Sequence, residues 1–177
     1  MTRKWQFAGA LLAVLFAFPG TSHAVIGASL FSIGGDVQVE ILPFSAAFTN
    51  ELHLFSPGPD RFIGLNTEVG KVVDLGNFPS GEELIFGIFV QNTGNTFVMG
   101  PGSRNPDGVA HADVTVLNPR VATVAFEDLY GGGDVDYNDL GFRVTQCHSV
   151  IPEPASAVLM TVGLLGTVIR RRSRSRI

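Results

Sequence analysis

Residues 121–146 read VATVAFEDLYGGGDVDYNDLGFRVTQ, and this stretch decides the fold that we expect. It begins with VATVAF, a short run rich in apolar and β-branched residues, and ends with LGFRVTQ, in which apolar and polar residues alternate. Both runs are typical of β-strands that bury one face. The intervening residues 127–139 hold three consecutive glycines among many acidic residues, which is a loop composition. The stretch therefore predicts two strands joined by an acidic loop.

Further runs of the same kind lie upstream of this stretch. They occupy residues 37–42, 48–55, 84–91 and 109–117, and clusters of Gly, Pro, Asn and Asp separate them. Many short strands divided by turn residues are typical of β-sandwiches and jelly rolls. We therefore expect an all-β fold, a single β-sandwich or jelly-roll-like domain over residues 25–149.

The charges of the chain are unevenly distributed. Of the 12 Lys and Arg residues, two lie in residues 1–24 and five in residues 150–177, and of the 16 Asp and Glu residues only Glu153 lies in either end. Residues 25–149 thus hold five basic and 15 acidic residues, a net charge near −10. Binding to nucleic acid needs clustered Lys and Arg, so we expect no nucleic-acid partner.

The acidic loop is the one group of residues with a chemistry of its own. Its oxygen-bearing side chains are Glu127, Asp128, Asp134, Asp136, Asn138 and Asp139. Carboxylates this close repel one another unless a cation or hydrogen-bond donors compensate, and no Lys or Arg lies between Val121 and Phe142. The order Asp-x-Asp-x-Asn resembles the start of calcium loops, and a glycine-rich backbone can offer carbonyl oxygens as well. We predict that these six residues bind one Ca²⁺ ion.

Two other interpretations of the loop stay open. Asp and Asn side chains bind their own backbone readily, so Asp128 or Asn138 could cap turns in a loop without metal. Two of the carboxylates could also form a glycosidase pair, which requires them to face each other across a cleft. The remaining candidates for catalysis are isolated: His53 and His111 are expected on the surface, and Cys147 in a linker. We predict no catalytic residue and no enzymatic activity.

The stretch VAFEDLYGGGDVDYNDLGFRV resembles the motif of an exported bacterial domain family of unknown function. Members of that family carry a similar pattern of Phe-Glu-Asp, Gly-Gly-Asp and Asp-Tyr-Asn-Asp between two closing strands. The resemblance implies that the six loop residues named above occupy the acidic positions of the family. Because the family has no settled activity, the resemblance implies no function for this chain.

The N-terminus has the three-part layout of a secretion signal. Arg3 and Lys4 precede an uncharged apolar run at 7–18, and Ser22-His23-Ala24 supplies small residues where a signal peptidase reads them. The apolar run is too short to span a bilayer permanently. We predict a signal helix within residues 1–24, removed by cleavage after Ala24.

The C-terminus, residues 150–177, has a second three-part layout. The tripeptide Pro152-Glu153-Pro154 precedes an uncharged apolar segment at 155–169, and an arginine cluster that begins with Arg170, Arg171 and Arg172 follows. This order resembles the PEP-CTERM sorting signal of Gram-negative bacteria. The resemblance implies recognition by exosortase, a membrane protease, and transit through the inner membrane. We expect a hydrophobic transmembrane helix before processing, with the arginines on the cytoplasmic side.

Together these observations predict an exported protein at the cell surface or in the extracellular matrix. Its β domain would be a calcium-stabilised structural or adhesive module, with exopolysaccharide as a further partner. The alternative is a secreted polysaccharide hydrolase that uses the loop carboxylates. Carboxylates converging on one point would favour the metal, whereas two facing each other across an open groove would favour catalysis.

Overall fold

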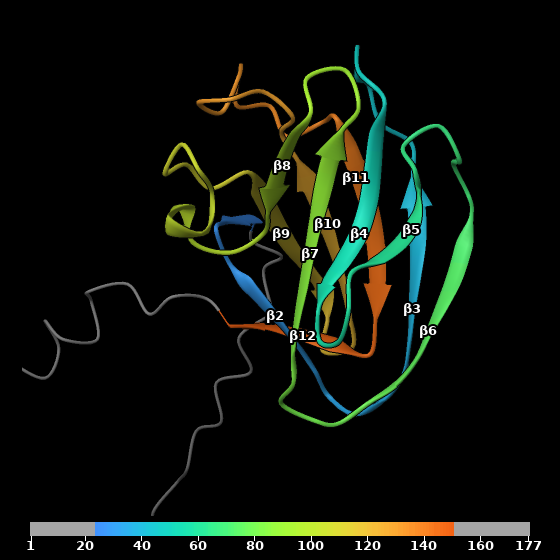
Figure 1. Ribbon diagram of the computed structural model, residues 1–177. Coiled ribbons are helices and arrows are strands. Elements are labelled where there is room, and N and C mark those ends of the chain that lie inside the picture. Colours follow the sequence, from blue (N-terminus) through green and yellow to red (C-terminus); the bar gives the residue numbers. More distant parts are fainter. Residues whose placement is uncertain (1–23, 151–177) are drawn as a thin grey trace, which may run out of the picture.

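The computed structural model describes residues 24–150, which form two antiparallel β-sheets packed face to face (Figure 1). The strands of the first sheet are, in spatial order, β1 (Ala24–Ile26), β9 (Ala112–Asn118), β10 (Val121–Phe126), β11 (Leu140–Thr145), β3 (Gly35–Leu42) and β6 (Val72–Phe78). Those of the second are β12 (Cys147–Val150), β2 (Ser29–Ser32), β7 (Glu83–Val90), β4 (Asn50–Ser56) and β5 (Arg61–Leu65), and β8 (Asn95–Val98) pairs with β7. A short 3₁₀ helix, η1 (Gly102–Arg104), precedes β9. The predicted all-β fold is confirmed.

The alternation of side chains along β10 and β11 sets the buried face of the first sheet. Every second residue of each strand is buried, including Val124 of β10 and Phe142 of β11, which stand opposite each other in the antiparallel register. This period of two is what a pleated strand with one covered face requires. The same register places the ends of the two strands, Phe126 and Leu140, side by side, and so brings the two ends of the acidic loop together.

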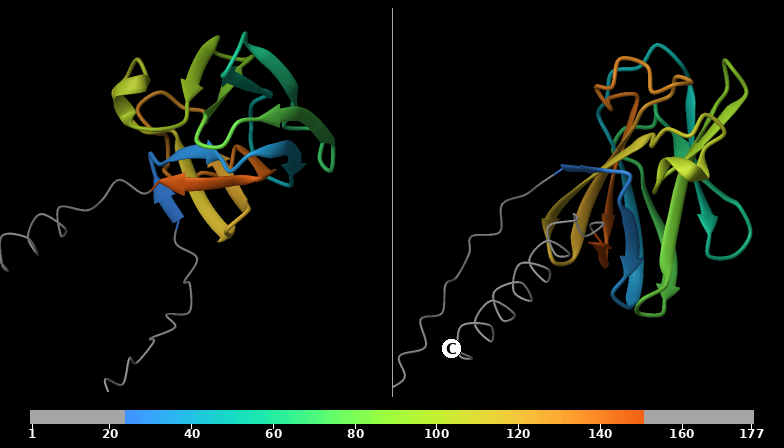
Figure 2. Two further views of the ribbon diagram at one scale, coloured as in Figure 1. Left: turned by 90° about the horizontal axis from the view of Figure 1, so that it is seen from below. Right: turned by 90° about the vertical axis from the view of Figure 1, so that its left-hand side faces the viewer.

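The core lies between the two sheets, which Figure 2 shows as separate layers. β7 runs through the middle of the second sheet, and its residues Leu84, Phe86, Ile88 and Val90 are fully buried. The ring centroids of Phe86 and Phe142 lie 4.9 Å apart, so these aromatic side chains pack together across the two sheets. Burial of one side chain of this size stabilises a fold by roughly 1.5–3 kcal/mol.

The chain passes between the sheets at a corner made by two neighbouring connections. β2 continues into β3 through Ile33, and β11 continues into β12 through Gln146, whose carbonyl accepts a hydrogen bond from the Ile33 N–H at 3.0 Å. Cys147 follows as the first residue of β12 and is 1% exposed. The expectation that Cys147 lies in a linker is therefore wrong. Burial raises the pKa of its thiol to about 12, which leaves the thiol unreactive.

The predicted signal segment and sorting tail lie outside the described residues, except for Ala24 and Val150. The signal helix and the transmembrane helix that the sequence predicts therefore also lie outside the described residues. Between residues 24 and 150, no helix is long and apolar enough to cross a membrane.

Candidate metal centre

The acidic loop, residues 127–139, connects β10 to β11 at one end of the sandwich (Figure 1). Its two ends are tied by the backbone, because the Asp139 N–H donates to the Phe126 carbonyl at 3.1 Å. The Glu127 N–H donates to the His111 carbonyl at 2.9 Å, which fixes the first residue of the loop against the residue that precedes β9. These two hydrogen bonds fix the first and last residues of the loop to the ends of the neighbouring strands.

The backbone of the loop takes up conformations that most residues avoid. Gly131, Gly132 and Gly133 have φ angles of 80°, 85° and 49°, and Val135 and Tyr137 also have positive φ, at 62° and 51°. Residues with a side chain rarely adopt this left-handed region, and such outliers gather at functional sites. At Gly133 the space is also decisive, because a Cβ there would collide with Oε1 of Glu127.

The structure divides the predicted ligands into two groups that share Glu127. The outer group contains Glu127, Asp134 and Asp136, and the inner group contains Glu127, Asp128 and Asp139. Within each group, one carboxylate oxygen from every member lies within 4.8 Å of the others. Asp134 and Asp136 are exposed, whereas Glu127 and Asp128 are only 1% and 3% exposed.

The sixth predicted ligand, Asn138, lies next to the outer group, where its side-chain amide nitrogen contacts Oδ2 of Asp136. The Asn138 carbonyl accepts the Ser45 N–H at 2.9 Å, so its backbone serves to anchor the loop. The structure thus places the other four predicted carboxylates around Glu127, with Asn138 beside the outer group.

The carboxylates of the inner group are buried close together, which disfavours their charged forms. Burial, together with the charges of Asp128 and Glu127, raises the pKa of Asp139 to about 7. Burial and the charges of Asp134 and Asp136 also raise the pKa of Glu127. Among residues 24–150, no ion pair joins a basic side chain to any of these five carboxylates. Some of the repulsion is relieved by hydrogen bonds, such as that from the Asp128 N–H to Oδ2 of Asp139 at 2.9 Å.

Two buried asparagines donate hydrogen bonds to residues of the inner group. Asn50, at the start of β4, donates from Nδ2 to Oδ2 of Asp128 at 2.8 Å. Asn66, which follows β5, donates from Nδ2 to the Phe48 carbonyl at 2.9 Å and to the Asp139 carbonyl at 3.3 Å. Both side chains are essentially inaccessible, at 0% and 1% exposure, and their Oδ1 atoms have no hydrogen-bond partner. A buried amide oxygen without a partner costs stability, and it is also an oxygen of the kind that Ca²⁺ binds.

His111 and Asp107 form a buried pair that contacts the acidic loop at Glu127 and Gly131. His111 is fully buried; its Nδ1 lies 2.9 Å from the Glu127 carbonyl oxygen and its Nε2 2.8 Å from Oδ2 of Asp107. Both neighbours are acceptors, so only a doubly protonated ring satisfies them. Although burial alone would raise it, hydrogen bonds from the Gly131 and Val109 N–H groups and from His111 lower the pKa of Asp107 to about 2. Asp107 therefore binds both the Gly131 N–H of the loop and the imidazole ring that contacts the Glu127 carbonyl.

Sequence reasoning missed four of the residues that build this centre. Asn50, Asn66 and Asp107 carried no local signal, and His111 was expected on the surface because a strand was predicted from residue 109. The strand begins instead at Ala112, and the His111 ring turns inward and stacks on Phe97 with 3.7 Å between ring centroids. His53 was also expected on the surface, but its side chain is only 12% exposed between Glu51 and Asp60.

Two protein-family models match segments of the chain. Residues 150–172 match the PEP-CTERM protein-sorting motif. The chain carries a PEP-CTERM sorting signal. In this PEP-CTERM protein, residues 78–146 also match a domain of unknown function, DUF4114, so both predicted resemblances are confirmed. The DUF4114 match covers the acidic loop, its two flanking strands, Asp107 and His111, but it begins after Asn50 and Asn66.

The sorting motif decides the route of this PEP-CTERM protein. It implies export through the membrane and processing by exosortase, a membrane protein. No curated protein is significantly similar in sequence to the chain. The function of the exported domain therefore has to be argued from its own residues.

Proposed function

We propose that the exported domain of this PEP-CTERM protein is a non-enzymatic structural or adhesive module, stabilised by one Ca²⁺ ion. The ion would bind in the acidic loop at the inner group of carboxylates, and the module would act at the cell surface or in the extracellular matrix. In this arrangement the ion takes the place of the basic side chain that the buried carboxylates lack.

The observation that carries the proposal is the convergence of Glu127, Asp128 and Asp139 beside two buried asparagines whose amide oxygens have no hydrogen-bond partner. Ca²⁺ takes six to eight oxygen ligands in a flexible geometry. Three carboxylates that can each bind through one or two oxygens, together with Oδ1 of Asn50 and Asn66 after rotation of the amides, supply a set of that kind. Every donor atom in this set is a hard oxygen, which favours Ca²⁺ or Mg²⁺ over transition metals.

The same convergence argues against the polysaccharide hydrolase. A retaining glycosidase separates its two carboxyl groups by about 5–5.5 Å and an inverting one by about 6.5–9.5 Å, with the sugar between them. Here Glu127 and Asp128 are almost completely buried, and the oxygens of the inner group lie within 4.8 Å of one another. The inner group is therefore not the pair of carboxylates across an open cleft that a glycosidase requires.

Contact with polysaccharide is supported by a separate surface on the first sheet. A groove of about 370 Å³ is lined by Asp36, Gln38, Arg120, Val121, Thr145 and Gln146. A smaller hollow of about 130 Å³ shares Gln38 and Thr145 with it and continues to the ion pair of Arg143 and Glu40. Amide, hydroxyl and charged side chains in a row can exchange hydrogen bonds with sugar hydroxyls. This surface is distinct from the acidic loop, so adhesion and calcium binding can be tested separately.

The calcium proposal is tested by thermal unfolding of residues 25–150, whose two sheets enclose a core of their own. Melting temperatures are compared in excess chelator, in Ca²⁺ and in Mg²⁺. An ion that binds only the folded state adds about 2.7 kcal/mol at a hundredfold excess over its dissociation constant. We expect a clear rise in melting temperature with Ca²⁺ and a smaller one with Mg²⁺, which gives up its water reluctantly.

The matched variants are Glu127→Gln, which removes the charge shared by both carboxylate groups, and Asp74→Asn, which removes an exposed charge on β6. Glu127→Gln is expected to lose the calcium response, and Asp74→Asn to keep it. An unchanged melting temperature of the unsubstituted domain in millimolar Ca²⁺ would overturn the metal proposal. Adhesion is tested by co-sedimentation with exopolysaccharide from the producing bacterium, where the double variant Gln38→Ala/Arg120→Ala is expected to bind less.

A further inference from the structure

The first described strand, β1, contains the predicted signal-cleavage site. β1 is only three residues long and lies at the edge of the first sheet, where Ala24, Val25 and Ile26 stand opposite Thr115, Val114 and Asp113 of β9. Cleavage after Ala24 would make Val25 the first residue of the mature protein, still inside this ladder. Chain ends fray unless something fixes them, so a terminus at this place needs an anchor.

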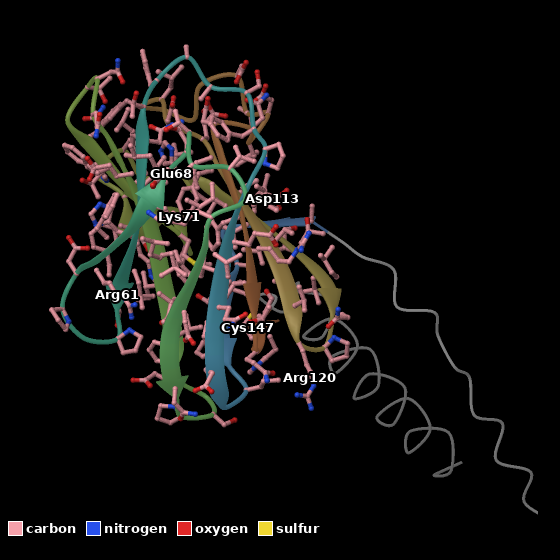
Figure 3. The ribbon with its side chains drawn as sticks, turned by 90° about the vertical axis from the view of Figure 1, so that its right-hand side faces the viewer. Arg61, Glu68, Lys71, Asp113, Arg120 and Cys147 are labelled. Atoms are coloured by element: carbon pink, nitrogen blue, oxygen red, sulfur yellow. The ribbon has the colours of Figure 1, made fainter. Side chains whose placement is uncertain are left out.

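Asp113 on β9 has the features of such an anchor. Its carboxylate stands opposite Ile26, next to Val25, and lies close enough to the backbone N–H groups of Val114 and Val25 for both to lower its pKa. Its Oδ1 is buried and has no hydrogen-bond partner, and in the described part of the chain no basic side chain forms an ion pair with Asp113. Figure 3 shows the residue beside β1, where the described chain begins. A carboxylate left half-satisfied is costly, because its desolvation is not repaid.

Burial raises the pKa of Asp113, and the two N–H groups only partly oppose this shift. Among residues 24–150, the group thus lacks a positive partner. The backbone nitrogen of Val25 is the one atom in contact with it whose charge processing would change.

Processing would supply that partner. Hydrolysis of the Ala24–Val25 peptide bond consumes one water molecule, leaves a carboxylate on Ala24 and turns the Val25 nitrogen into an ammonium group. The single amide N–H of Val25 would become a charged donor with three protons, one of which can still serve the strand ladder while another meets Oδ1 of Asp113. Hydrogen bonds between two charged groups are roughly twice as strong as those between neutral ones.

We propose that the mature N-terminus is locked into the sheet by an ion pair between the α-ammonium of Val25 and the carboxylate of Asp113. The side chain of Val25 packs against the core, which holds the nitrogen at the right place in the ladder. Only a chain cut after Ala24 can form this pair, because the uncut chain has a neutral amide at the same atom. Removal of the signal would therefore complete the fold as well as release the chain. This inference rests on the predicted cleavage site and is independent of the calcium proposal.

The test uses the full chain, exported with its own signal in a Gram-negative host and purified after processing. N-terminal sequencing is expected to read Val-Ile-Gly-Ala-Ser. The amines are then labelled by reductive methylation at pH 7 and followed by peptide mass spectrometry. Residues 25–177 contain a single lysine, Lys71, so the chain has only two amines and Lys71 serves as an internal reference.

An α-amino group ordinarily has a pKa of about 7.7–8.0, and a close opposite charge raises it by one to three units. Labelling of Val25 should therefore be roughly tenfold slower in the unsubstituted protein than in Asp113→Asn, because less of the amine is unprotonated at pH 7. Asp74→Asn, which removes an exposed carboxylate that accepts the Gly76 N–H at 2.8 Å, should label like the unsubstituted protein. Lys71 should label alike in all three.

A first residue other than Val25, or equal labelling rates in the unsubstituted protein and Asp113→Asn, would overturn the proposal. Should Asp113→Asn fail to fold, the pKa of the Val25 amine in the unsubstituted protein decides the question. It is measured from the pH dependence of the labelling rate. A pKa above 8.5 supports the ion pair, and a pKa at or below 8.0 overturns it.

Discussion

Nε2 of His111 lies 2.8 Å from Oδ2 of Asp107, and both side chains are withdrawn from solvent, at 0% and 2% exposure. The pair joins the turn before β9 to the acidic loop, since the Asp107 carboxylate also accepts the Gly131 N–H at 2.8 Å. Removal of one partner from a buried ion pair leaves an uncompensated charge, which costs about 3–5 kcal/mol.

Asp107→Asn should accordingly lower the free energy of unfolding by about 3 kcal/mol. The measurement is urea denaturation at pH 7 in chelator. The matched control is Glu83→Gln, which breaks the partly exposed ion pair of Glu83 with Arg104 and should cost less than about 1 kcal/mol. Equal losses in the two variants would show that the Asp107–His111 pair contributes no more than a surface ion pair.

The same carboxylate sets an acid limit to stability. The pKa of Asp107 is about 2 in the folded protein, below the ordinary value of about 3.9 for an unfolded aspartate. A depressed pKa contributes stability that is fully present above the unfolded value and is lost as the pH falls toward the folded one. The difference in unfolding free energy between the unsubstituted domain and Asp107→Asn should therefore shrink as the pH falls from 4 to 2. A difference that stays constant down to pH 2 would contradict the shift.

The fold could be predicted to the extent that its strands carry their own pattern. β3, β4, β7, β9, β10 and β11 all fall on predicted runs, because each alternates or is continuously apolar over six or more residues. β12 and β8 are only four residues long, and β6 is interrupted at Gly76 beside a register shift against β3. Elements of this kind owe their pairing to neighbours that are remote in sequence, and local periodicity does not report those neighbours.

Of the candidate metal centre, only the residues of the acidic loop could be predicted from the sequence. The loop carboxylates are adjacent in the sequence, so their composition alone pointed to an ion. Asn50 is separated from Asp128 by 78 positions, and it meets that residue because β4 of one sheet starts opposite the end of β10 in the other. An asparagine in a β-strand run has no local feature that distinguishes a buried ligand from a surface residue.

Gly133 tests whether the glycine run is needed for the position of Glu127. A Cβ at Gly133 would collide with Oε1 of Glu127, so Gly133→Ala should displace that carboxylate and weaken the calcium response. Gly131→Ala is the matched control: its φ of 80° is equally left-handed, but a Cβ there meets nothing within 4 Å. Both variants should lose about 1–2 kcal/mol from backbone strain. Only Gly133→Ala should also show a smaller rise in melting temperature with Ca²⁺, and a full calcium response in Gly133→Ala would remove Glu127 from the ligand set.

The two carboxylate groups can be told apart, because each has members that the other lacks. If the ion binds in the inner group, as we propose, Asp139→Asn should abolish the calcium-dependent rise in melting temperature, and the double variant Asp134→Asn/Asp136→Asn should reduce it only in part through the lost field of two exposed charges. The separate stability of each variant in chelator serves as its own baseline, since Asp139 also accepts the Asp128 N–H at 2.9 Å and that bond is weakened by the substitution. The reverse result, a full response in Asp139→Asn and none in the double variant, would move the ion to the outer group. It would then bind in the exposed part of the loop, and the partnerless oxygens of Asn50 and Asn66 would need another explanation.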